Sequence, residues 1–225
     1  MNGALPTQIG GLILLIGLAG LARPAAADPR PSLRIVLHVC DDDSIPPNVV
    51  SRAKSEMTRI YRDAGINIGW IDQAPTATGP DSSQSPTASG LPLTLIILSR
   101  EMTDELTVAT TALGATPSTR EYRGRMAYVF YNRVERVART YVNTSRRRAT
   151  YDIDNVIVLA HAMAHEIGHL LLPHGHSATG LMRAEWDGKD LRRAVHGQLK
   201  FTPQQAELIR TRLITSNLVS YSIPE

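Results

Sequence analysis

The sequence predicts a single α+β domain over residues 28–225, with a mixed twisted sheet, a crossover helix, a central buried helix and a small C-terminal subdomain. Three patterns lead to this prediction. Residues 33–71 read as strand, helix and strand, residues 154–172 are apolar nearly all round, and a capped amphipathic helix begins near residue 202. A composition of 43% hydrophobic and 20% charged residues is close to the average for soluble globular proteins.

The first predicted unit is a strand–helix–strand crossover. Residues 33–39 are rich in β-branched side chains, which favours a buried strand. Residues 49–64 carry an apolar stripe at helical spacing, and Gly65 stops this helix. Residues 66–71 form the second strand, so the unit starts a sheet.

The middle of the chain predicts two further strands separated by irregular segments. Pro, Gly, Ser and Thr supply 12 of the 18 residues at 73–90, so we expect a mobile surface loop there. Residues 91–98 give the strongest strand pattern in the chain, and residues 125–131 alternate enough to form another strand. The intervening residues 101–123 predict irregular structure.

The amino terminus predicts export. An uncharged apolar run at residues 9–21 precedes three consecutive alanines, which is typical of a secretory signal peptide over residues 1–27 that is cut after Ala27. An uncleaved membrane anchor is the alternative, since no Lys or Arg precedes the run. We expect a secreted or periplasmic protein with no stable membrane association after cleavage. The 24 basic and 21 acidic side chains are nearly balanced, so nucleic acid is not an expected partner.

The buried helix carries two histidines four residues apart, His165 and His169. Residues at this spacing lie on one side of a helix, so both imidazoles can bind one metal ion. Zinc accepts imidazole nitrogen and, at catalytic sites, takes three protein ligands and a water molecule. Glu166 lies next to His165 but about 100° around the helix, where its carboxylate can accept a proton from that water without binding the metal. The sequence therefore predicts one catalytic zinc ion with Glu166 as the general base.

Two histidines downstream, His174 and His176, are candidates for the third ligand, because the proline and the glycine around them turn the chain back toward the helix. At this point the chain resembles the metzincin zinc peptidases, whose motif is H-E-x-x-H-x-x-G-x-x-H followed by a turn with methionine. The resemblance covers residues 165–182. It implies that His165 and His169 are zinc ligands and that Glu166 is the catalytic glutamate.

The third ligand departs from the family motif, since His176 stands one residue later than the motif requires. His176 is still favoured over His174, because His176-Ser177 followed by Leu181-Met182 resembles the corresponding stretch of matrixins. The resemblance implies that Met182 packs beneath the metal. It also implies a peptide or protein substrate that lies antiparallel along an exposed edge strand, for which residues 125–131 are the best candidate.

Three alternatives remain open from the sequence. A thermolysin-like arrangement would take Glu185 as the third ligand, although its neighbours do not favour a helix. A zinc-binding but catalytically inactive protein of the same fold would use the histidines without turnover. An exported binding module without metal would leave the histidines incidental.

Overall fold

The computed structural model describes residues 33–41, 45–71, 90–99, 111–117, 124–145, 154–173 and 175–221. The predicted signal peptide at residues 1–27 and the predicted loop at 73–90, apart from Gly90, lie outside these residues. None of the helices within the described ranges has the length and apolar character needed to cross a bilayer.

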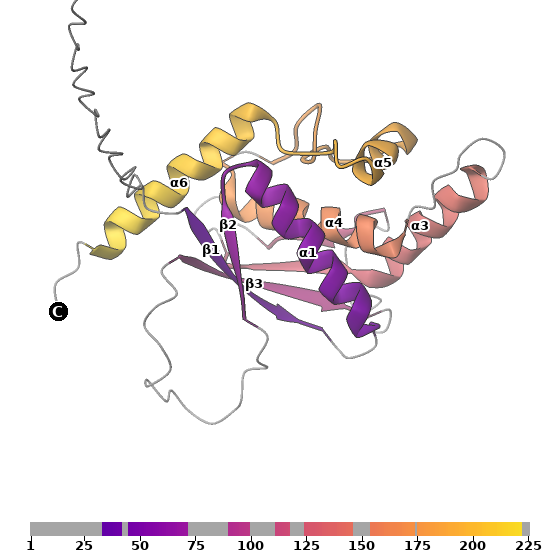
Figure 1. The fold of residues 1–225 in the computed structure, drawn as a ribbon, viewed down its shortest axis with the longest axis horizontal. Helices are drawn as coiled ribbons and strands as arrows, with labels where there is room; N and C mark the ends of the chain where they lie inside the picture. The colour runs from indigo at the N-terminus through magenta and orange to yellow at the C-terminus, as the bar shows by residue number, and fades with distance from the viewer. Residues whose placement is uncertain are drawn as a thin grey trace, which may run out of the picture. The chain divides into compact units, whose positions relative to one another are not determined.

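A five-stranded mixed sheet forms the base of the domain (Figure 1). Its strand order is β2-β1-β3-β5-β4, in which the first four strands run parallel and β4 runs antiparallel to β5. The strands are β1 (Arg34–Cys40), β2 (Asn67–Ile71), β3 (Leu91–Leu98), β4 (Gly114–Ala115) and β5 (Met126–Phe130). The predicted α+β class with a mixed sheet is therefore confirmed.

The predicted crossover unit is also confirmed. Helix α1 (Pro47–Asp63) connects β1 to β2, which pair in parallel. Its buried residues include Ala53, Met57 and Ile60, whose spacing of three to four residues matches the apolar stripe. The helix ends before Gly65, whose φ of 79° is a conformation that a side chain disfavours.

The prediction that residues 125–131 form the exposed edge strand is wrong. β5 covers only Met126–Phe130 and lies between β3 and β4, so β4 forms that edge of the sheet. A strand as short as Gly114–Ala115 has no detectable alternation, and glycine is unfavourable in strands, so the sequence indicated a turn. The glycine is needed because a Cβ there would lie 2.4 Å from the Tyr128 carbonyl oxygen.

Helix α3 (Tyr131–Ser145) follows β5 directly and was not predicted. Its buried residues Tyr131, Val134 and Ala138 recur at helical spacing, which was the available signal. Tyr131 also fits the end of the predicted strand at residues 125–131, so the start of the helical spacing cannot be recognised from the sequence.

Helix α4 (Asn155–Leu171) is the central helix and lies between α1 and α3 (Figure 1). The side chain of Asp154 accepts a hydrogen bond from the Val156 amide at 3.0 Å and so caps the start of the helix. The buried Tyr61 hydroxyl of α1 donates to the Ala164 carbonyl at 3.1 Å and fixes the two helices together. The predicted buried central helix is confirmed.

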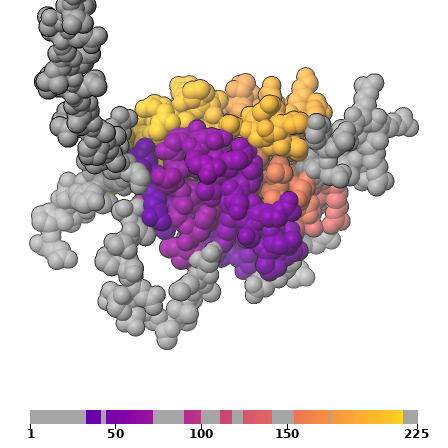
Figure 2. Space-filling view, in the orientation of Figure 1, coloured from indigo at the N-terminus to yellow at the C-terminus, as the bar shows by residue number. Residues whose placement is uncertain are grey.

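Two helices complete the chain, α5 (Gly188–Val195) and α6 (Pro203–Tyr221). Thr202 and Gln205 bond each other's backbone amides, so the predicted capping box at the start of α6 is confirmed. In Figure 2 the violet surface of α1 meets the yellow surface of α6, where Arg210 donates to the Ala64 carbonyl at 2.7 Å. Residues Ser32–Glu225 form one compact unit.

Candidate metal centre

Helix α4 is mostly apolar, and three of its polar side chains, those of His165, Glu166 and His169, lie near its C-terminal end. His165 and Glu166 are buried, and His169 is partly buried. Because a polar group buried without a partner is costly, each of these side chains calls for a specific interaction. His165 has the Leu181 carbonyl as a partner, His169 has the His165 ring, and Glu166 has the Thr116 hydroxyl.

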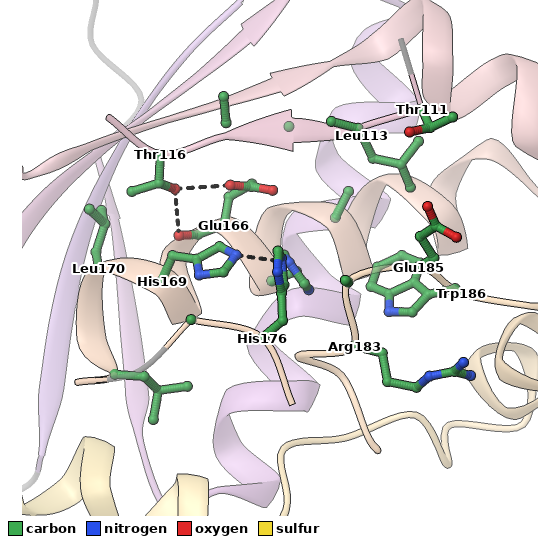
Figure 3. Close-up of a pocket in the computed structure, with 18 of the residues that line it drawn as sticks. Thr111, Leu113, Thr116, Glu166, His169, Leu170, His176, Arg183, Glu185 and Trp186 are labelled. Atoms are coloured by element: carbon green, nitrogen blue, oxygen red, sulfur yellow. Dashed lines mark hydrogen bonds between the residues drawn. The ribbon is translucent and has the colours of Figure 1, made fainter. Parts of the chain in front are cut away.

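Three histidines converge at one point (Figure 3). The Nε2 atoms of His165 and His169 lie 3.0 Å apart, and one ring nitrogen from each of His165, His169 and His176 lies within 4.8 Å of the other two. The ring of His176 lies 5.4 Å from that of His165 and 4.8 Å from that of His169, measured between centroids. The three residues are close enough to bind one metal ion.

The orientation of His165 is fixed by a backbone carbonyl. Its Nδ1 lies 2.8 Å from the Leu181 carbonyl oxygen, which can only accept, so Nδ1 carries the proton and Nε2 keeps its lone pair. Trp186 donates from Nε1 to the same oxygen at 3.1 Å, and its ring meets the His165 ring edge-on at 5.7 Å. A carbonyl partner of this kind is what orients histidine ligands at metal sites.

The loop that carries His176 is anchored on both sides. The Ser177 amide donates to the Met182 carbonyl at 2.8 Å, and the Ser177 hydroxyl accepts a hydrogen bond from the Gln205 amide group at 3.0 Å. Gly180, with a φ of 78°, lies in the turn between Ser177 and Met182. The alternative ligand His174 lies outside the described residues.

Met182 packs directly beneath the helix. It is fully buried, and a Cβ on Gly168 would lie 2.6 Å from its sulfur atom. The close approach therefore depends on glycine at a position between the two histidines of α4. The segment that follows His176 is thus packed against α4 next to its two histidines.

Burial keeps His165 and His169 in the neutral form that binds metal. Burial lowers the pKa of His165 to about 4, with a further contribution from the nearby His176. Burial and the neighbouring imidazoles lower the pKa of His169 to about 3. Both rings are therefore neutral at physiological pH, and a neutral imidazole is the ligand that a metal ion requires.

The donor set fits zinc. Three imidazole ligands would leave one position open in a tetrahedral shell. Ligands about 2.0–2.1 Å from a tetrahedral ion are separated by about 3.3 Å. The His165 and His169 nitrogens are 3.0 Å apart, and the three ligand nitrogens all lie within 4.8 Å of one another.

The Glu166 carboxylate lies between the histidine cluster and the edge of the sheet (Figure 3). The Thr116 hydroxyl lies 2.9 Å from its Oε2 and 3.1 Å from its backbone carbonyl. A Cβ on Gly114 would lie 2.5 Å from its Cγ, so the edge strand contacts the carboxylate closely. Burial raises the pKa of Glu166 to about 7, although the hydrogen bond from Thr116 opposes the shift.

Thr116 is the residue of this arrangement that the sequence did not indicate. It lies fifty positions before Glu166, in a segment that predicted only irregular structure. A single threonine in such a segment gives no local signal. The pairing depends on how β4 passes over α4.

The alternative ligand Glu185 and a further histidine of α4, His161, both lie apart from the three-histidine cluster. Glu185 lies on the wall of the same cavity, which has a volume of about 920 Å³, but it does not belong to the cluster of three histidines. His161 is fully buried in the core, where its Nδ1 donates to the Ile157 carbonyl at 2.8 Å. Trp186 packs against the rings of His161 and His165.

No protein-family model matches the chain, and a search of curated proteins finds no similar sequence. The fold and the site define a class by themselves: an α+β domain in which three histidines can hold a metal ion below the edge of a mixed sheet.

Proposed function

We propose that the protein is an exported zinc-dependent peptidase. The observation that carries the proposal is the position of Glu166, which lies between the three histidines and the edge strand β4 on the wall of one cavity. A site that binds zinc only for structure normally fills all four positions with protein ligands and needs no carboxylate beside it. The apolar run and the alanines within residues 1–27 support export.

The resemblance to metzincins supports the same proposal. The sequence motif, the buried methionine beneath the histidines and a mixed sheet above the active-site helix are consistent with that family. Met182 is fully buried and contacts α4 at Gly168, between the two histidines of the motif. We assign the chain a metzincin-like architecture on these grounds.

A zinc ion held by His165, His169 and His176 would polarise a substrate carbonyl and lower the pKa of a water molecule. The protein supplies the base. Glu166 accepts the proton of the attacking water at its carboxylate and can return it to the leaving amine. Thr116 holds the carboxylate in place, since its hydroxyl can donate to the ionised group.

The substrate would be an extended peptide that pairs with β4. This strand is the last in the described sheet, so one side of its backbone is not paired with another strand of that sheet. An added peptide strand would gain main-chain hydrogen bonds there. Antiparallel pairing is favoured because its hydrogen bonds are slightly more stable per residue. Such a peptide would place its backbone directly over the histidines.

Metal analysis and a cleavage assay test the proposal. Protein purified without a histidine tag should retain about one zinc ion per chain and should cleave an unfolded protein substrate. A chelator such as 1,10-phenanthroline should abolish cleavage, and added zinc should restore it. Purified protein that neither retains zinc nor cleaves any member of a large peptide mixture would contradict the proposal.

The role of Thr116 gives a separate prediction. Thr116→Val keeps the shape of the side chain but removes the donor to Glu166, so kcat should fall about tenfold while KM stays close to that of the wild type. Thr116→Ser retains the hydroxyl and should recover most of the rate. Steady-state kinetics on one peptide gives both constants. A serine variant as slow as the valine variant would show that the methyl group, rather than the hydroxyl, matters.

A further inference from the structure

The cavity extends from the histidines along residues 111–113, which come just before the edge strand β4. Thr111 and Leu113 form one side of this extension, and Glu185 and Trp186 face them from the loop after Met182 (Figure 3). Val137 of α3 and Ala162 of α4 also line the cavity. The space is large enough for a long side chain of a bound peptide.

The walls of this extension combine apolar surface with three polar side chains, those of Thr111, Arg183 and Glu185. Leu113, Val137, Ala162 and the ring of Trp186 contribute hydrocarbon or aromatic surface. Glu185 is exposed, and in Figure 3 its carboxylate points toward Leu113 and Thr111 across the space. A side chain that enters here would therefore meet an apolar passage and then a carboxylate.

The negative charge of Glu185 is not compensated within the described residues. None of them forms a hydrogen bond or an ion pair with it, and the nearest cation along the chain, Arg183, is paired with Asp190 and Asp187. Asp190 is almost fully buried, so this pairing holds the guanidinium in place. A cationic group of a substrate could therefore pair with Glu185 without displacing a partner among the described residues.

The direction of the peptide follows from the direction of β4. The chain runs from Thr111 through Gly114 to Thr116, and Glu166 contacts the end of this segment. A peptide antiparallel to β4 runs the opposite way, so the residues after the cleaved bond lie toward Thr111 and Glu185. The extension therefore receives a side chain from the carboxyl-terminal side of the cleaved bond.

We propose that the enzyme prefers substrates with Arg or Lys on the carboxyl-terminal side of the cleaved bond, and that Glu185 determines this preference. Arginine and lysine combine an apolar stem with a charged end, which matches the order of surfaces in the cavity. The indole face of Trp186 adds a favourable surface for a cation. This inference rests on the proposed peptidase function.

The test begins with a peptide mixture digested by the wild-type protein, in which the cleaved sequences are identified by mass spectrometry. Arg or Lys should be enriched after the cleaved bond. One cleaved sequence is then synthesised with arginine or with citrulline, which has nearly the same shape but no charge. The value of kcat/KM should be about fivefold higher for arginine, as expected for a partly exposed ion pair, and the ratio should fall as salt is added.

Three variants assign the preference to Glu185. Glu185→Gln should bring the arginine-to-citrulline ratio close to one, and Glu185→Lys should make peptides with glutamate at that position the better substrates. Glu207→Gln removes an exposed carboxylate of α6, outside the cavity lining, and should leave the ratio unchanged. Because Glu185 and Glu207 are exposed, these changes should not disturb folding.

A binding measurement separates this inference from the proposed function. The fluorescently labelled peptide pair is titrated with Glu166→Gln protein, with and without Glu185→Gln, and anisotropy gives the affinities. Tighter binding of the arginine peptide that disappears with Glu185→Gln supports the inference. Equal binding of both peptides, or a wild-type digest without basic enrichment, overturns it while leaving the peptidase proposal intact. A wild-type protein that neither cleaves nor binds any peptide overturns both.

Discussion

Replacing Glu166 by glutamine should lower kcat/KM by about a hundred- to ten-thousandfold, the usual contribution of a general base. Glutamine has nearly the same shape and its amide oxygen can still accept the hydrogen bond from Thr116, so the fold should be retained. The three histidines are unchanged, so zinc should be retained as well. Cleavage rates, zinc content and circular dichroism, measured on the same preparation, check all three statements.

Glu207→Gln serves as the matched control, since it makes the same chemical change on the exposed surface of α6. If the Glu166→Gln protein cleaves peptides at the wild-type rate, the proposed mechanism is wrong. If wild-type protein retains zinc but neither it nor Glu166→Gln cleaves peptides, the alternative of a zinc-binding protein without turnover is the better description. The variant thus distinguishes a zinc peptidase from a zinc-binding protein without turnover.

The second large effect concerns stability. His169→Gln removes one of the three nitrogens that surround the proposed ion, so this protein should lose zinc during dialysis. A ligand that binds only the folded state stabilises it by about 2.7 kcal/mol when its free concentration is a hundred times Kd. Added zinc should therefore raise the unfolding midpoint of the wild type and leave that of His169→Gln unchanged.

His196→Gln is the control for this experiment, because it removes an exposed imidazole outside the cluster. Its response to zinc should equal that of the wild type. Denaturant unfolding at fixed free zinc, with metal analysis of each sample, provides the measurement. An equal zinc response in His169→Gln would show that the ion binds somewhere other than at the three histidines.

The parts of the fold that the sequence predicted are those with local signals. Helix α4 was evident from its apolar run, and α6 from its capped start near residue 202. His165 and His169 come together because four residues nearly complete a helical turn, and this follows from the sequence alone. His176 required the additional observation that the chain turns back after Leu171.

The parts that the sequence missed depend on contacts between distant segments. β4 has two residues and exists because it pairs with β5, so no periodic pattern could reveal it. The pairing of Thr116 with Glu166 follows from that strand and could not be inferred before it. Helix α3 did have an amphipathic pattern, and it was missed because Tyr131 also suited the preceding strand.

The hydrogen bond from Gln205 to Ser177 has a consequence for the order of folding. Ser177 is adjacent to His176, whereas Gln205 belongs to the cap of the last helix. Because a chain is synthesised from its amino end, the loop with the third histidine lacks this anchor until the start of α6 has emerged. We therefore expect the three histidines to take up their final arrangement, and a metal ion to bind there, only after α6 has been made.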